Sequence, residues 1–122
     1  MAYIVLTQEY GETHKRDFDA FDTKGRQFGA CATIVDHIFR NATEEEINRG
    51  YMFNYAEEGR RNRVTAPTTR FGFRPHAMRN GSSYGSSHGT KLFDTEAARD
   101  QAIERYFVDA EKRAMKNKAR AA

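Results

Sequence analysis

Residues 17–34 read DFDAFDTKGRQFGACATI, and this stretch determines how the rest of the chain can be arranged. Its first six residues come close to the alternation of polar and apolar side chains that is typical of a strand with one buried face. The glycine-containing segment 23–26 supplies a turn, and a long second strand is expected from Gln27 to Phe39. The stretch therefore predicts a β-hairpin, which indicates an antiparallel sheet.

Before this hairpin, the chain is expected to form one short strand and one loop. Residues 2–7 (AYIVLT) are β-branched and aromatic enough to predict a strand. Residues 9–17 are polar and contain Gly11, which favours a loop. We therefore expect a separate N-terminal strand in the sheet.

Further strands are expected after the hairpin. Residues 51–56 (YMFNYA) place three aromatic rings on one face at period two, which is the usual pattern of core packing. Residues 69–79 are extended, with two phenylalanines on one face and two arginines on the other. Because Pro75 has no backbone N–H, this strand is expected to lie at an edge or to break there. Residues 90–93 predict a last, short strand.

A second glycine turn is expected at Asn80-Gly81, the strongest short turn signal in the chain. Residues 79–87 also repeat the pattern of residues 23–31, since each glycine turn is followed three residues later by an aromatic residue and a glycine. The similarity indicates two related hairpins in one sheet.

A short helix is expected near residues 43–49. Thr43 can cap its start, and Glu46 can complete a capping box with Thr43. Gly50 stands where a C-terminal cap belongs, so the helix should have only about two turns. The three consecutive glutamates are explained by the helix dipole, which favours acidic residues in the first turn.

The C-terminal helix gives the clearest pattern. Asp94 or Thr95 is expected to cap it, and it should run to about Lys118. Acidic residues populate its first turns, and every charged residue after Glu111 is basic, as the helix dipole favours. Apolar residues recur along it at helical spacing and form one stripe: Ala98, Ala102, Ile103, Tyr106, Phe107, Ala110 and Ala114.

Together these elements predict an α+β fold: an antiparallel sheet of four to six strands, a long C-terminal helix packed on one face and a short helix near 43–49. With 122 residues, the chain is expected to form a single compact domain at 1–118 and a basic disordered tail at 119–122. The expected core consists of Ile4, Leu6, Phe21, Phe28, Ile34, Phe53, Phe73, Leu92, Ile103 and Phe107.

Composition limits the classes of protein to consider. A hydrophobic fraction of 39% is too high for a fully disordered chain. The single cysteine, Cys31, can form no intramolecular disulfide, and its small apolar neighbours indicate a buried thiol in a reducing compartment. The apolar run at the N-terminus is too short for a signal peptide, and no stretch approaches the length of a membrane span. We therefore expect a cytoplasmic protein.

Charge is distributed unevenly along the chain. Residues 1–58 hold six basic and eleven acidic residues, whereas residues 59–93 hold seven basic residues and no acidic one. Six of those seven are arginine, whose planar guanidinium suits phosphates and carboxylates and stacks on flat rings. Aromatic residues lie among these cations, as they do in many proteins that bind single strands or RNA.

The leading hypothesis is therefore a non-catalytic protein whose arginine-rich surface, drawn from residues 60–91, binds DNA or RNA without sequence specificity. The residues expected to bind are Arg60, Arg61, Arg63, Arg70, Arg74, Arg79, Tyr84 and Lys91. Alternatively, the arginines could pair inside the fold with the acidic N-terminal half.

A second hypothesis is an inhibitor or adaptor whose arginines bind an acidic surface on a larger protein complex that handles nucleic acid. Accessory proteins of phages and mobile elements are often small single domains of this kind, including those that disable a bacterial defence effector such as a CRISPR complex. Such a protein would form a stoichiometric complex and would have negligible affinity for bare oligonucleotides.

Catalytic patterns are weak in this sequence. The four histidines have no regular spacing, so neither a metal site nor a bound cofactor is expected. The segment 81–89 is rich in glycine but lacks the lysine of a phosphate-binding loop. One enzyme hypothesis remains, a small ribonuclease that would use His76, His88, Tyr84 and nearby arginines as acid, base and cations.

Overall fold

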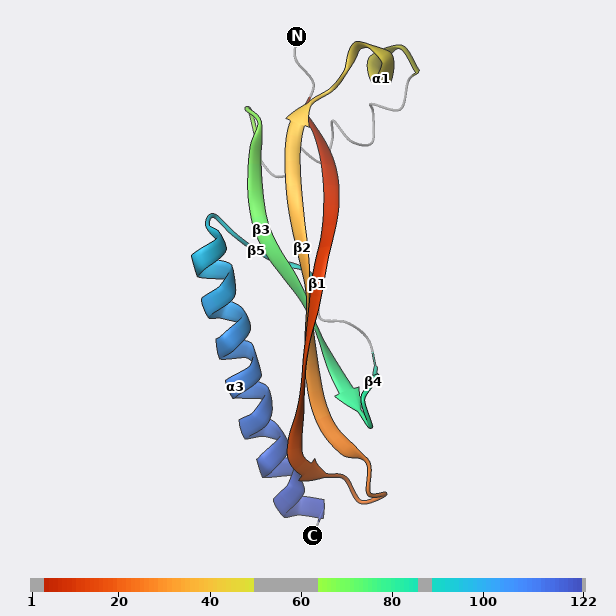
Figure 1. The fold of residues 1–122 in the computed structure, drawn as a ribbon, viewed down its shortest axis with the longest axis vertical. Helices are drawn as coiled ribbons and strands as arrows, with labels where there is room; N and C mark the ends of the chain where they lie inside the picture. The colour runs from red at the N-terminus through yellow and green to blue at the C-terminus, as the bar shows by residue number, and fades with distance from the viewer. Residues whose placement is uncertain (1–3, 50–63, 86–88, 122) are drawn as a thin grey trace.

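Figure 1 shows the computed structural model, which describes residues 4–49, 64–85 and 89–121. The described strands are β1 (Ile4–Phe21), β2 (Gln27–Asn41), β3 (Thr68–Arg79), β4 (Ser82–Ser83) and β5 (Lys91–Phe93), and the helices are α1 (Glu44–Arg49) and α3 (Glu96–Ala121). The sheet is antiparallel and has the order β1-β2-β3-β4, with β5 also paired to β3. This arrangement confirms the α+β fold expected from the sequence.

The first strand differs from the prediction. Instead of a short strand and a loop, β1 runs without a break from Ile4 to Phe21 and pairs with β2 over almost its whole length. A register shift between Tyr10 and Thr13 accommodates one extra residue, as in a β-bulge. In the described sheet β1 pairs with β2 alone, and such an edge strand tolerates the polar residues that suggested a loop.

The two glycine turns are confirmed and lie side by side. Gly25 and Gly81 have positive φ angles of 76° and 75°, and Asn80 has a φ of 52°. At Asn80-Gly81 both central residues have positive φ, which is the geometry of a two-residue hairpin turn whose twist matches that of its strands. Gln27 N–H donates to Asn80 Oδ1 and Asn80 N–H donates to the Gln27 carbonyl, both at 2.9 Å, so the second turn is bonded to the start of β2.

Pro75 lies between the two segments of β3 that pair with β5 and β4, on the edge of β3 that faces away from β2. That side pairs with β5 over Phe71–Phe73 and with β4 at Met78 and Arg79. The Ala77 carbonyl accepts from Tyr84 N–H on the same side, so alternation along the strand places Pro75 there as well. The strand therefore continues through Pro75, and the missing N–H falls where no described strand pairs.

Both helices begin as the sequence predicts. In α1, Thr43 N–H donates to Glu46 Oε1 at 2.9 Å and Glu46 N–H donates to Thr43 Oγ1 at 3.2 Å, which completes the capping box. In α3, Ala98 N–H donates to Thr95 Oγ1 at 3.1 Å. Thr95 is therefore the cap.

The helix α3 packs along one face of the sheet (Figure 1), and the core forms between them. The buried members of this core are Phe18, Ala20, Phe28, Ala30, Ala32, Phe73, Ile103, Phe107 and Ala114. Cys31 is also buried, on the opposite face of β2, and its burial raises the pKa of its thiol.

The predicted core is confirmed in its centre and wrong at one end. Phe28, Phe73, Ile103 and Phe107 are buried, and the predicted aliphatic members are partly buried: Ile4, Leu6, Ile34 and Leu92. Phe21 is 44% exposed, and Phe18 takes the core position, because side chains alternate along β1: Phe18 and Ala20 face α3, and Phe21 lies on the other face. Phe53 and the strand expected at 51–56 lie outside the described residues.

A buried ion pair holds the start of α3 to the sheet. Arg99 is 6% exposed, and its Nη1 donates to Asp36 Oδ1 at 3.1 Å. Asp36 also accepts from Gly72 N–H at 3.3 Å. At Gly72 an added Cβ would lie 2.7 Å from the Val35 and Lys91 carbonyl oxygens, so the close approach of β2, β3 and β5 requires glycine there.

Within the part of the chain that the structure describes, neither helix combines the length and apolar character needed to cross a membrane.

Candidate nucleic-acid interface

The structure distributes the expected binding residues over three places. Arg79 and Tyr84 lie together beside the glycine turns, Arg70 and Arg74 lie on the sheet face opposite α3, and Lys91 lies beside α3. Arg60, Arg61 and Arg63 lie outside the described residues. The predicted set therefore forms no single patch among the residues that are described.

The first place is a cluster that we call the turn-end cluster: Asp22, Lys24, Arg26, Phe28, Arg79 and Tyr84. The guanidinium carbon of Arg79 lies 3.9 Å from the ring centre of Phe28 and 4.9 Å from that of Tyr84. Arg26 lies over the same Tyr84 ring at 5.7 Å. Since Tyr84 is 47% exposed, this end of the sheet presents an open ring with two arginines against it.

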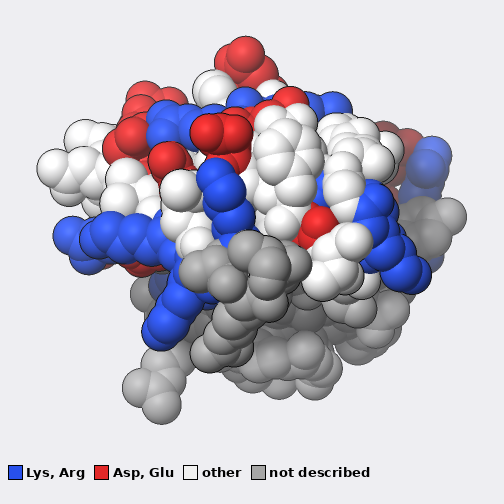
Figure 2. Space-filling model, turned by 90° about the horizontal axis from the view of Figure 1, so that it is seen from below, with Lys and Arg blue, Asp and Glu red and all other residues white. Residues whose placement is uncertain are grey.

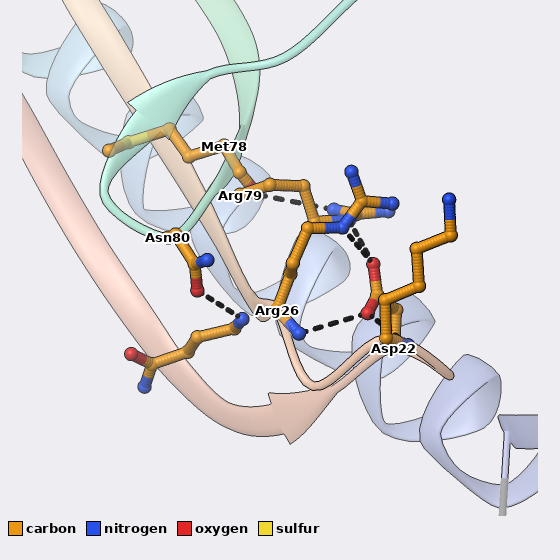
Figure 3. A network of polar contacts seen from close by, with 7 residues as sticks. Asp22, Arg26, Met78, Arg79 and Asn80 are labelled. Atoms are coloured by element: carbon orange, nitrogen blue, oxygen red, sulfur yellow. Dashed lines mark hydrogen bonds and ion pairs between the residues drawn. The ribbon is translucent and has the colours of Figure 1, made fainter.

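One carboxylate serves both arginines of the cluster (Figure 3). Asp22 accepts from the backbone N–H groups of Lys24 and Arg26 at 2.9 Å each and from Arg26 Nε at 2.8 Å. Arg79 Nε is farther away, at 3.8 Å. The backbone hydrogen bond from Arg26 contributes most to holding the pKa of Asp22 below its ordinary value, so this carboxylate is ionised at neutral pH. With Lys24, the cluster has three cations and one anion.

The last turns of α3 come to the same end of the molecule (Figure 1). Lys118 Nζ donates to the Asp19 carbonyl at 3.2 Å, which joins this basic part of the helix to β1 next to the hairpin turn. Seen from this end in Figure 2, Lys and Arg side chains project on both sides, with acidic side chains between them. Three segments that are far apart in sequence thus bring cations to one end.

The second place is the sheet face opposite α3, where Arg70 and Arg74 both lie, as predicted. Arg74 lies 5.8 Å from the ring centre of Tyr10 and donates to Thr90 Oγ1 at 3.4 Å. Arg70 lies 5.5 Å from the ring centre of Phe39. Tyr10 is 57% exposed, so this face also has a cation beside an accessible ring.

Most acidic residues of the N-terminal half that form ion pairs here do so with arginines outside the acid-free segment 59–93. Such pairs are Asp22–Arg26, Asp36–Arg99, Glu45–Arg49 and Glu46–Arg40. From the acid-free segment, Arg79 reaches Asp22 only at 3.8 Å, and Arg74 and Lys91 form no ion pair with a described carboxylate. Pairing inside the fold therefore does not account for Arg74 or Lys91.

The residues of the ribonuclease hypothesis are only partly described. The ring Nε2 of His76 lies 2.7 Å from the Gly85 carbonyl oxygen, and because a carbonyl only accepts, this nitrogen must carry a proton. His88 lies outside the described residues. In the described ranges, histidine, cysteine and carboxylate side chains form no group of three that could hold a metal ion.

Sequence reasoning missed Arg26 as a member of the turn-end cluster. It lies in the acidic half of the chain, so a search by regional charge passes over it. The signal that could have found it is the matching pattern of the two glycine turns, which puts the residue after each glycine turn at one end of the sheet.

No protein-family model, curated protein or solved structure matches this chain.

Proposed function

We propose that this protein is a non-catalytic binding protein that engages nucleic acid through the turn-end cluster. The observation that carries the proposal is the Arg79 guanidinium, which lies between the Phe28 and Tyr84 rings beside a single carboxylate shared with Arg26. Arg79 Nη1 donates to the Met78 carbonyl at 3.1 Å, which leaves the other N–H groups of the guanidinium. They can then donate to a phosphate at the rim of the cluster.

The exposed ring of Tyr84 supports the same proposal. Bases stack on aromatic side chains irrespective of their identity, so an open ring next to cations favours binding without sequence specificity. Lys24 is exposed and its side chain makes no contact with a described carboxylate, so it adds a charge for a second phosphate. The matching chemistry is a phosphate chain that carries flat rings.

The direct test is fluorescence anisotropy of labelled single- and double-stranded DNA and RNA, titrated with the protein at low and near-physiological salt. We expect micromolar or tighter binding that weakens steeply with salt. Replacement of Lys24 by alanine should reduce the slope of log K against log salt by about 0.7 to 0.9, the value for one lost phosphate contact. Arg79→Ala should reduce both the slope and the affinity, because it removes a phosphate contact and also the guanidinium that lies against the Phe28 and Tyr84 rings.

Arg49→Ala is the matched control, because it removes one positive charge from α1, where Arg49 pairs with Glu45. It should leave the slope unchanged. If the protein binds no oligonucleotide even at low salt, the proposal fails. A stoichiometric complex with an acidic protein would then favour the adaptor hypothesis. If Lys24→Ala and Arg49→Ala lowered the affinity and the salt slope equally, the protein's net charge alone would explain the effect, and this would also count against the cluster.

A further inference from the structure

A groove beside α3 contains cations that have no acidic partner among the residues that the structure describes. The groove has a volume of about 680 Å³ and lies between α3 and the edge of the sheet at β3 and β5. Lys91 contributes from β5, and Arg105 and Arg113 contribute from α3. All three are exposed, and none forms an ion pair with any carboxylate that the structure describes.

The one carboxylate in the lining, Asp109, forms no ion pair with the arginines next to it. Asp109 stands four residues from Arg105 and four from Arg113 on the same helix, a spacing at which opposite charges can pair. Even so, no nitrogen of either arginine lies within 4.0 Å of its carboxylate oxygens. The lining therefore has a net charge of +2 from three cations and one anion.

Aromatic rings form the inner wall of this groove. Phe73 and Phe93 are stacked with ring centres 6.1 Å apart and planes 4° apart, and Tyr106 lies 6.2 Å from Phe73. Phe73 is fully buried, whereas Phe93 and Tyr106 are only partly buried, so parts of their rings line open space. A ligand that suits this groove has negative charge along one side and flat or apolar groups along the other.

The groove leads toward the turn-end cluster. Arg105 and Arg113 are eight residues apart, which corresponds to about 12 Å along a helix. Both arginines lie on the side of α3 that faces β3 and β5, so they could contact successive anions along the helix toward the end of the molecule where α3 and the first hairpin turn lie (Figure 1).

We propose that this groove holds a segment of single-stranded nucleic acid, with its phosphates against Lys91, Arg105 and Arg113 and an unpaired base against Phe93 and Tyr106. The inference rests on the proposed function and extends it by naming the form of nucleic acid. In a duplex the bases are stacked inside and the phosphates lie outside, so the aromatic wall would receive no base. Only an unpaired strand presents both groups to the groove.

The experiment compares single strands with duplexes of the same length and sequence, in both DNA and RNA. The wild-type protein should bind the single strand more tightly than the duplex. The variant Arg105→Ala/Arg113→Ala should lower single-strand affinity by about tenfold or more, and its salt slope should fall by about 1.4 for two lost contacts. Its duplex affinity should change by less than about twofold, since the turn-end cluster is intact.

Two controls separate charge and folding from the groove. Arg49→Ala/Lys112→Ala removes the same charge from residues that do not line the groove, and it should keep the preference for single strands. Phe93→Leu keeps an apolar side chain without a ring and should lower single-strand affinity by about fivefold or more, the effect of one lost base stack.

The outcomes distinguish the two proposals. If the wild-type protein binds no nucleic acid, both fail. If it binds duplex as tightly as single strand, or if the groove variant weakens both forms equally, the groove inference is overturned while the turn-end proposal stands. Binding of polyglutamate as tight as that of the single strand would also overturn it, because the groove would then recognise an acidic polypeptide.

Discussion

Two aspartates of this protein are partly buried and accept hydrogen bonds from backbone N–H groups and from arginine, but the arginines that they bind differ in exposure. Asp36 binds Arg99 where the arginine side chain is 8% exposed, and this pair joins α3 to the sheet. Asp22 binds Arg26 where the arginine side chain is 38% exposed, and Arg79 lies nearby. The comparison teaches that burial decides the role: a buried pair stabilises the fold, whereas an exposed one leaves its cations accessible to a partner.

The largest expected effect is on stability when the buried pair is broken. Asp36→Ala leaves the guanidinium of Arg99 in a buried site without its partner on β2. We expect a loss of about 3 kcal/mol in the free energy of unfolding, the low end for such a change, because Arg99 keeps a contact with Asp100. Urea denaturation measures it. A loss no larger than that caused by Asp22→Ala would contradict the distinction between the two sites.

A smaller effect is expected from the stacked arginine. Arg79→Lys keeps the positive charge but removes the planar group that lies between Phe28 and Tyr84. The protein should lose about 1 kcal/mol of stability, a typical value for a partly exposed cation–π contact. Thermal and urea denaturation beside Arg49→Lys, which has no such ring contact among the described residues, test this, and equal stability of the two variants would show that the stack contributes nothing.

Asp22 should oppose binding by partly neutralising Arg26 and Arg79. Asp22→Asn keeps an oxygen that accepts the Lys24 and Arg26 N–H groups while it removes the negative charge. Nucleic-acid affinity should therefore rise several-fold at low salt, and the gain should shrink as salt increases. Anisotropy titrations at two salt concentrations give the answer, and a fall in affinity would show that Asp22 positions the arginines rather than competing for them.

The smallest effect concerns a third pair, between Arg40 and Glu46 in the capping box of α1. The hydrogen bonds from Arg40, and then that from Thr43 N–H, lower the pKa of Glu46 from 4.5 to about 2. The carboxylate therefore contributes its stabilisation above pH 4.5, and this is lost as the pH falls through about 2. NMR titration of the carboxyl group should show that midpoint, and Arg40→Ala should return it toward the ordinary value. An unchanged midpoint in the variant would exclude Arg40 as the main cause.

The elements that the sequence predicted well depend on neighbouring residues. The turn at Gly25, the capping box at Thr43 and the stripe of α3 each need only contacts within a few positions, so local patterns reveal them. The continuity of β1 depends instead on its partner β2, which supports polar residues that resemble a loop. The Asp36–Arg99 pair joins residues 63 positions apart, and no local pattern can show such a contact.

The candidate site was predictable to a similar degree. Arg79 and Tyr84 are close in sequence as well as in space, so one acid-free segment contained both. Arg26 and the groove arginines Arg105 and Arg113 come from segments whose net charge is acidic or nearly neutral. Arg26 became a candidate because the fold brings it to the Tyr84 ring, and Arg105 and Arg113 because α3 places them in one groove with Lys91; both are properties of the three-dimensional arrangement.

The position of α3 after the strands in the sequence has a consequence for how the protein is made. Residues of β1, β2 and β3 leave the ribosome before the helix that covers them, and the apolar face around Phe28 and Phe73 waits until Phe107 and Ala114 have been added. During that interval the nascent chain exposes a hydrophobic surface, and incomplete proteins with such a surface aggregate or recruit chaperones. A chain that stalls before α3 should therefore be a target for quality control rather than a smaller working domain.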